Sequence, residues 1–135
     1  MAVQLSVAVR NARADAVEST IGTSAILKFR SGAQPATCAT ADSGTVVGTL
    51  SLPSDWMAAA SSGAKAKAGT WEDASADASA TIAHFRIYDS GGTVCGMQGS
   101  VTLTAGGGDI TLDAVVVTAG QDIVVTSFGW TEPNS

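Results

Sequence analysis

Charged side chains are scarce in this sequence. Asp, Glu, Lys and Arg make up 14% of the 135 residues, while hydrophobic residues make up 45%. An ordinary soluble domain carries about 25% charged residues. Disordered chains combine high charge with low apolar content, so this composition excludes a disordered protein. We expect part of so weakly charged a surface to be covered by another molecule.

The sequence also has no long hydrophobic run and no basic leader. No stretch approaches the roughly 18 apolar residues of a transmembrane helix, and the N-terminal MAVQLSVAVR lacks a basic segment followed by an apolar one. We therefore expect no membrane partner and synthesis in a cytoplasm. The net charge of −5 argues against nucleic acid as a partner.

The few charges are unevenly divided along the chain. Residues 1–30 hold four basic and two acidic residues, a net charge of +2, whereas residues 31–135 hold three basic and ten acidic residues, a net charge of −7. Two interpretations stay open. The split is either ordinary variation over a surface or the basis of a contact between the basic end of one copy and the acidic body of another.

Cysteine and histidine are nearly absent. Cys38 falls in a loop-like segment and Cys95 in a strand-like one. Without a secretion signal we expect both thiols to stay reduced, with a disulfide as the alternative. The two cysteines and the single histidine, His84, do not have the spacing of a zinc site.

One helix is predicted, over residues 5–21. Leu5, Val9, Ala12 and Ala16 recur at helical spacing and form one apolar face. Gly22 stands where a C-cap glycine is expected. Because the face consists largely of alanine, it suits close packing on a sheet or on a partner.

After the helix the hydrophobic period changes to two, which predicts strands. About seven to eight short strands are expected, the clearest over 24–30, 45–52, 81–88, 94–104, 110–117 and 122–130. Residues 31–44 read as a loop, and residues 55–80 as an irregular arm or loop able to lie on a neighbouring subunit. The pattern predicts a single domain over 1–135, an all-β sandwich with one N-terminal α-helix.

The alternation assigns side chains to the two faces of the predicted strands. Ala25, Leu27 and Phe29 are expected to face the core, as are Ala83, Phe85 and Ile87. His84, Arg86 and Tyr88 are expected to point outward. The runs VVV (115–117) and IVV (123–125) are continuous and apolar, which is typical of strands covered on both faces.

Candidate residues for chemistry are few. His84 lacks a serine in a recognisable nucleophile context, so we interpret it as a surface histidine. Glu72, Asp73 and Asp77 superficially resemble a calcium loop without the full pattern, and a solvated acidic loop is favoured.

Two further carboxylates, Asp109 and Asp113, flank a predicted strand and give no support for a glycosidase pair. The glycine-rich stretch 105–109 lacks the lysine and helix of a phosphate-binding loop. Trp56, Trp71 and Trp130 are interpreted as core or interface anchors, with a sugar-binding platform as the alternative. We assign no catalytic, cofactor-binding or metal-binding residue.

Several segments together have a familiar pattern. They are SVAVRNARADAVESTIG, SAILKFRSGAQPATCATADSGTVVGTLSL, ATIAHFRIYDSGGTVCGMQGSV and ITLDAVVVTAGQDIVVTSFGW. In this order they resemble small virion structural proteins of tailed bacteriophages, a group that includes capsid decoration, or cement, proteins. The likeness covers nearly the whole chain except about residues 55–75, and no catalytic signature accompanies it.

The resemblance implies a jelly-roll-like β-sandwich and a non-enzymatic role on the capsid surface of a virion. A protein of this group binds the major capsid protein from outside, associates with itself as a homo-dimer or homo-trimer, and locks neighbouring coat subunits. A tail or fibre component with a receptor- or glycan-binding role is the alternative. The family transfers no active-site residues to this chain.

Overall fold

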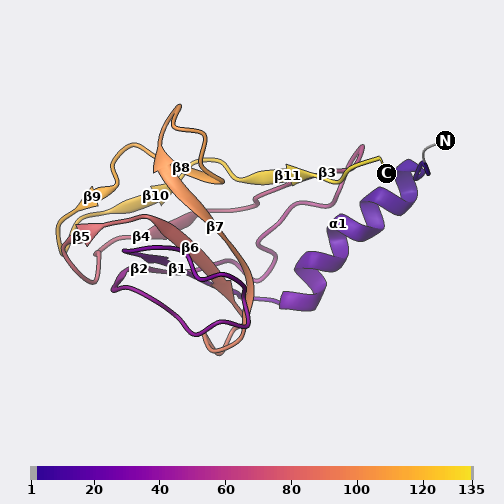
Figure 1. The fold of residues 1–135 in the computed structure, drawn as a ribbon. Helices are drawn as coiled ribbons and strands as arrows, with labels where there is room; N and C mark the ends of the chain where they lie inside the picture. The colour runs from indigo at the N-terminus through magenta and orange to yellow at the C-terminus, as the bar shows by residue number, and fades with distance from the viewer. Residues whose placement is uncertain (1–2, 135) are drawn as a thin grey trace.

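A computed structural model describes residues 3–134. In these residues the chain forms one helix followed by eleven short strands (Figure 1). The elements are α1 (Val7–Ile21), β1 (Ile26–Arg30), β2 (Val46–Ser51), β3 (Ala64–Ala66), β4 (Trp71–Asp73), β5 (Ala80–Thr81), β6 (His84–Tyr88), β7 (Cys95–Leu103), β8 (Ile110–Leu112), β9 (Val116–Val117), β10 (Ile123–Val125) and β11 (Gly129–Thr131).

The strands form one larger sheet and three small ones. The five-stranded sheet has the order β2-β1-β6-β7-β8, and its neighbours are antiparallel except for β7 and β8. Three two-stranded pairs, β10–β4, β11–β3 and β5–β9, make up the remainder. The fold is therefore mostly β with one helix and resembles a β-sandwich, as the sequence predicts at this level.

One face of the five-stranded sheet carries the core. Leu27 pairs with Ile87 and Phe29 pairs with Phe85 across β1 and β6, and all four side chains are at most 1% exposed. The inward positions predicted from the alternation are confirmed for these four residues, whereas Ala83 is exposed. Each large apolar side chain buried in this way contributes about 1.5–3 kcal/mol.

The strands near the C-terminus are shorter than predicted. The expected strand 110–117 is divided into β8 and β9, and the expected strand 122–130 into β10 and β11. Val116 is 73% exposed and Val124 is 40% exposed, while Val117 and Val125 are buried. The prediction that both apolar runs are covered on two faces is therefore wrong, because only alternate side chains reach the core.

The segment 55–80 differs from the predicted irregular arm. It contains β3, β4 and the first residue of β5, and Trp56, Met57 and Trp71 are fully buried in the core. Trp56 donates its indole N–H to the carbonyl of Gly22 at 2.9 Å. Large aromatic side chains bury too much apolar surface to be left on a loose arm, so the segment becomes part of the body.

Helix α1 has a capping group at each end, of which the sequence predicts only Gly22. The hydroxyl of Ser6 accepts the backbone N–H of Val9 at 3.2 Å. Gly22 has φ of 102° and donates its N–H to the carbonyl of Glu18 at 2.8 Å. The predicted helix and its C-cap glycine are confirmed. The helix lies to one side of the strands, and its first turn lies close to the C-terminus (Figure 1).

The predicted apolar face of α1 is turned away from the body. Val9 is 45% exposed and Ala12 and Ala16 also face solvent, whereas Ala14 on the opposite side is fully buried. The side that faces the body is rich in polar groups, which bond to the strands and loops beneath. Burying alanine side chains removes little apolar area, so these polar contacts decide how the helix is turned.

Candidate functional site

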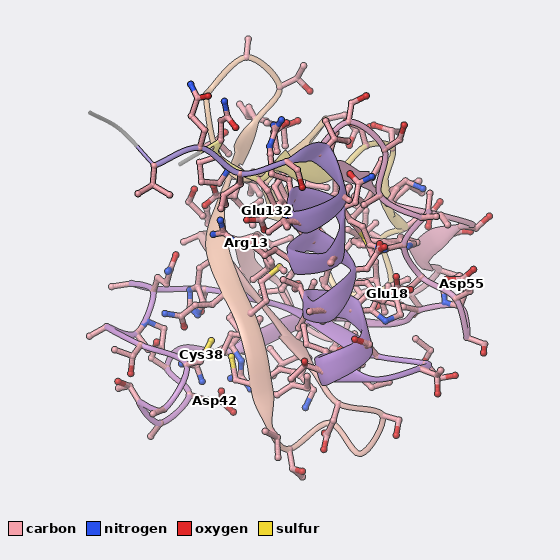
Figure 2. The ribbon with its side chains drawn as sticks, turned by 90° about the vertical axis from the view of Figure 1, so that its right-hand side faces the viewer. Arg13, Glu18, Cys38, Asp42, Asp55 and Glu132 are labelled. Atoms are coloured by element: carbon pink, nitrogen blue, oxygen red, sulfur yellow. The ribbon has the colours of Figure 1, made fainter. Side chains whose placement is uncertain are left out.

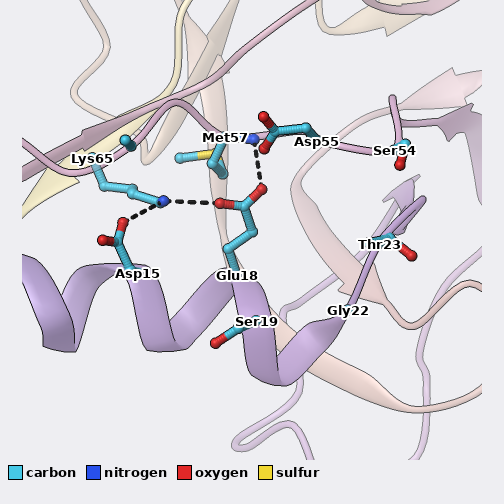
Figure 3. A pocket seen from close by; sticks show the side chains of 10 residues that line it. Asp15, Glu18, Ser19, Gly22, Thr23, Ser54, Asp55, Met57 and Lys65 are labelled. Atoms are coloured by element: carbon cyan, nitrogen blue, oxygen red, sulfur yellow. Dashed lines mark hydrogen bonds and ion pairs between the residues drawn. The ribbon is translucent and has the colours of Figure 1, made fainter.

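The second half of α1 is fastened to the body by a buried lysine. Lys65 Nζ lies 2.7 Å from Asp15 Oδ1 and 2.8 Å from Glu18 Oε2 (Figure 3). The same carboxylates accept backbone N–H groups, Glu18 from Met57 at 3.1 Å and Asp15 from Ala60 at 3.0 Å. The ion pairs therefore sit within a set of charge-assisted hydrogen bonds, which are stronger than neutral ones.

A second set of contacts ties the first half of α1 to the turn before β3 and to the C-terminal segment. Asn11 Oδ1 accepts the backbone N–H of Gly63 at 2.8 Å. Arg10 donates through Nε and Nη2 to the carbonyl of Glu132 at 3.0 and 2.9 Å, and Arg13 Nη2 lies 3.2 Å from Glu132 Oε2. The basic N-terminal region thus meets the acidic body within one chain.

These contacts hold Lys65 and Asp15 in their charged forms. Burial works against the charge on Lys65, but the hydrogen bonds to Asp15 and Glu18 outweigh it and the pKa of Lys65 is raised. The hydrogen bond from Lys65, and after it the one from Ala60, lowers the pKa of Asp15. A groove of about 570 Å³ opens beside them and is also lined by Asp55. The buried Lys65 and its two carboxylate partners serve to anchor the helix.

Fewer charged residues line the groove on the opposite flank of α1. A groove of about 610 Å³ lies between α1 and the β6–β7 hairpin, lined by Arg13, Ala16, Val17, Thr20, Ile21, Asp89, Val94, Cys95 and Gly96. Val94 on the hairpin is 63% exposed, and Ala16 belongs both to this groove and to the outward face of the helix. We call Val9, Ala12, Ala16, Val17 and Val94 the helix–hairpin surface. Figure 2 shows Arg13 and Glu132 on this flank, with Glu18 and Asp55 on the other.

A glycine lets the hairpin come close to the helix. A Cβ placed on Gly96 would lie 2.4 Å from Cγ1 of Ile21, closer than carbon atoms approach in folded proteins. Gly96 therefore fixes the distance between β7 and the end of α1. The helix–hairpin surface is held in place from both sides, by the buried lysine and by this close approach.

The outer face of the five-stranded sheet carries a buried polar cluster beneath residues 31–44. Asp42 accepts hydrogen bonds from Arg86 Nη1 at 2.7 Å, from the Tyr88 hydroxyl at 2.6 Å and from Arg30 Nη2 at 3.1 Å. Arg86 and Tyr88 are at most 2% exposed. The prediction that they point out to solvent is wrong, because the loop folds back and covers this face.

Further hydrogen bonds hold the backbone of the same loop. Arg86 Nη2 donates to the carbonyls of Thr37 and Thr40 at 2.9 and 3.0 Å. Gln98 Nε2 donates to the carbonyl of Pro35 at 2.8 Å. The loop is therefore fixed to β6 and β7 at several points along its length.

The electrostatics of the cluster favour the ionised carboxylate. Burial alone would raise the pKa of Asp42, but the hydrogen bonds from Tyr88 and Arg86 outweigh it and the pKa is lowered. The pKa of Tyr88 is raised by burial and by its hydrogen bond to Asp42. The sequence did not single out Asp42; its only signal was one acid in a loop that follows a strand ending in arginine.

His84 lies under the same loop. It is fully buried, and its Nδ1 lies 3.0 Å from the carbonyl of Gly32. Its interpretation as a surface histidine is wrong. Burial lowers the pKa of His84, and the nearby guanidinium groups of Arg30 and Arg86 lower it further, against the Gly32 hydrogen bond. A neutral imidazole is the form that suits this position.

The three candidate calcium carboxylates do not gather at one point, although two of them bond to Thr49. Asp73 Oδ2 accepts the backbone N–H of Thr49 at 2.9 Å, and Asp77 Oδ2 accepts the hydroxyl of Thr49 at 2.7 Å. Glu72 instead lies beside Asp122, whose hydrogen bond and charge raise the pKa of Glu72. Within residues 3–134, no three His, Cys, Asp or Glu side chains gather in a metal-binding arrangement.

The other candidates serve the fold. Asp109 Oδ2 accepts the backbone N–H and the hydroxyl of Ser100 at 2.9 and 3.0 Å, which closes the turn 105–109, while Asp113 is exposed. Trp56 and Trp71 lie with ring centroids 6.1 Å apart inside the core. Trp130 is only partly buried against the same core. A platform of three exposed tryptophans is therefore not formed.

The comparisons with known proteins are negative: no family model, no curated protein and no solved structure matches this chain. Of the residues that the structure describes, none belong to a helix long and apolar enough to cross a membrane.

Proposed function

We propose that this chain is a non-enzymatic virion structural protein with a jelly-roll-like β-sandwich fold. It binds the outside of a phage capsid and cements neighbouring coat subunits. Its partners are the major capsid protein and further copies of itself, in a homo-dimer or homo-trimer. It is made in the host cytoplasm, and neither nucleic acid nor a membrane is a partner. The resemblance of sequence pattern and one structural observation support this proposal.

The supporting observation is the helix–hairpin surface. Val9 and Val94 are 45% and 63% exposed. Val94 lines the groove, and Val9 lies two turns along α1 from Ala16, which also lines it. Isolated exposed valines are ordinary on a soluble protein, whereas an apolar helix face next to an apolar groove is typical of an interaction site. The occupant that we propose for it is a second copy of the chain.

The charges at the groove are self-complementary. Arg13 has a side chain that is 46% exposed, and Asp89 lies at the hairpin end of the same groove. Backbone hydrogen bonds from Thr93 and Val94 lower the pKa of Asp89, so it stays anionic at neutral pH. In a closed dimer or trimer, Arg13 of one copy can face Asp89 of the next.

Self-association explains how such a protein would cement a shell. When one subunit of an oligomer binds the shell, its other subunits are held at a high effective concentration near further coat subunits. The overall affinity is then much higher than that of each individual contact. It also stabilises the assembled shell over its separated subunits by mass action.

Light scattering on purified protein tests the self-association. The wild type is expected to be a dimer or trimer, and Val9→Asp and Val94→Asp to shift it toward monomer. Val116→Asp is the matched control, because Val116 is 73% exposed on β9 and lies outside the helix–hairpin surface. A monomeric wild type, or equal association of all three variants, would contradict the proposal.

Co-sedimentation tests the capsid role. Wild-type protein is expected to pellet with expanded shells that lack it and not to bind free coat subunits. Val9→Asp should pellet less, because loss of the oligomer removes avidity. Immunogold labelling of the protein that is confined to the tail of the particle would instead favour the tail or fibre alternative. A glycan site built on Trp56 or Trp71 is not supported in either case, because both side chains are fully buried.

A further inference from the structure

The two cysteines, 57 positions apart in the sequence, meet at the edge of the buried polar cluster. Cys95 pairs with Tyr88 at the start of β7, and the Tyr88 hydroxyl bonds to Asp42 in the loop. Cys38 lies in the same loop, four residues before Asp42, so both cysteines lie at the same edge of the cluster. Figure 2 shows Cys38 and Asp42 together on the loop beside β7.

The loop is held on both sides of Cys38. Arg86 binds the carbonyls of Thr37 and Thr40 at 2.9 and 3.0 Å, and Gln98 binds the carbonyl of Pro35 at 2.8 Å. These anchors come from β6 and β7, the strands that position Cys95. The thiol pair is therefore brought together by its surroundings, and both cysteines are partly accessible to solvent.

We propose that Cys38 and Cys95 form an intramolecular disulfide when a small-molecule disulfide is present as oxidant. The bridge links the loop 31–44 covalently to β7 over the buried cluster of Arg30, Arg86 and Tyr88. This inference does not depend on the proposed function, because it concerns the two thiols alone.

The reaction is an ordinary thiol–disulfide exchange with oxidised glutathione. Burial, with the Cys38 thiol nearby, raises the pKa of Cys95 to about 12, so Cys95 is not the thiol that attacks first. The Cys38 thiolate attacks one glutathione sulfur, and a glutathione thiolate leaves. Cys95 then gives up its proton, attacks the Cys38 sulfur of the mixed disulfide, and releases the second glutathione. One oxidant molecule is reduced to two thiols, and one protein disulfide forms.

The bridge should stabilise the fold measurably. It closes a long loop in the unfolded chain and so lowers the entropy of that state. For a chain of this length the melting temperature of the oxidised monomer is expected to rise by roughly 10 °C over that of the reduced monomer.

The test uses the native wild-type protein incubated with oxidised glutathione, then alkylated and weighed intact. The expected result is a monomer that has lost two hydrogens, carries no glutathione, resists alkylation and reverts with a reductant. Cys38→Ser and Cys95→Ser should each lack both the bridge and the rise in melting temperature.

Three results would overturn the proposal. They are native protein that keeps both thiols, protein that accumulates only glutathione adducts or intermolecular dimers, and protein that forms the bridge only after unfolding in urea. The wild-type measurement stands even if a serine variant fails to fold, since the mass and the alkylation are read on the unmutated chain.

Discussion

Removal of the Asp42 carboxylate should loosen the loop 31–44 and destabilise the whole fold. In Asp42→Ala, Arg86 loses a partner at 2.7 Å, Tyr88 one at 2.6 Å and Arg30 one at 3.1 Å. Arg86 keeps its bonds to two loop carbonyls, but its charge is left without a counter-ion at a position that is 2% exposed.

The magnitude follows from these surroundings. Removing one partner of a buried ion pair costs about 3–5 kcal/mol. The Asp42 side chain is 41% exposed, so solvent screens part of the interaction, and we expect a loss of about 2–3 kcal/mol in the free energy of unfolding. With a urea slope of about 2 kcal/mol per molar for a domain of this size, the midpoint should fall by about 1 M.

Urea titrations followed by tryptophan fluorescence provide the assay, with Asp113→Ala as the matched control. Asp113 is exposed, so its substitution should change the free energy of unfolding by less than about 0.5 kcal/mol. Asp42→Asn keeps the shape of the side chain and should fall between the two. If Asp42→Ala unfolds at the same midpoint as Asp113→Ala, the polar cluster does not hold the loop and the reasoning fails.

Three further predictions concern the neighbouring elements. The pKa of His84 lies below its usual 6.5, chiefly because the side chain is buried. The unfolded chain therefore binds a proton at His84 before the folded chain does. The stability that neutral His84 provides is present above pH 6.5 and is lost as the pH falls through the folded-state pKa. His84→Gln should flatten a plot of urea midpoint against pH below 6.5, and an unchanged slope would count against this origin. Gly96→Ala should lower the free energy of unfolding by about 1–3 kcal/mol, because its Cβ would lie 2.4 Å from Ile21. The control is Gly91→Ala, whose Cβ has no neighbour closer than 3.6 Å. Equal melting temperatures for the two variants would refute the close approach. Lys65→Met should speed hydrogen exchange of the α1 amides, because it removes the ammonium group that lies 2.7 Å from Asp15 and 2.8 Å from Glu18. Protection of the amides equal to that in the wild type would show that the ion pairs do not anchor the helix.

The core face of the main sheet could be predicted from the sequence. Leu27 and Phe29 alternate with polar residues in one strand, and Phe85 and Ile87 do so in another, and each set is buried as expected. This works because burial of apolar area dominates the choice of face. The same residues pair across β1 and β6, because both sets have to be buried on the same face of the sheet.

The opposite face could not be predicted in the same way. The alternation that places Phe85 and Ile87 in the core places His84 and Arg86 on the other side, but it does not distinguish solvent from a covering loop. That distinction depends on Asp42, which reaches Arg86 only after residues 31–44 have folded back. A contact between residues 44 positions apart leaves no periodic trace in a sequence.

The helix shows a related limit. The pattern of Val9, Ala12 and Ala16 correctly marked one apolar face, yet the direction of that face depends on what the other side can bond to. Lys65 lies 47 positions or more from its helix partners and offers a buried cation to Asp15 and Glu18. Only the folded chain brings these groups together, so the sequence pattern alone could not orient the helix.

The two sides of α1 can be compared energetically. Turning the alanine-rich side inward would gain about 0.8 kcal/mol for each buried methyl-sized group, whereas the present orientation makes several charge-assisted hydrogen bonds worth about 1.5–3 kcal/mol each. Contacts within the chain therefore set the orientation of the helix, and a second copy that covers the outward apolar face does not have to displace those contacts. Association should then depend on how firmly the helix is held, because an ordered surface loses less conformational entropy on binding. On this reasoning Lys65→Met should weaken self-association in light scattering, although Lys65 lies outside the helix–hairpin surface. If hydrogen exchange shows that the helix of this variant is loosened and the variant still associates as strongly as the wild type, the contact between copies lies elsewhere on the molecule.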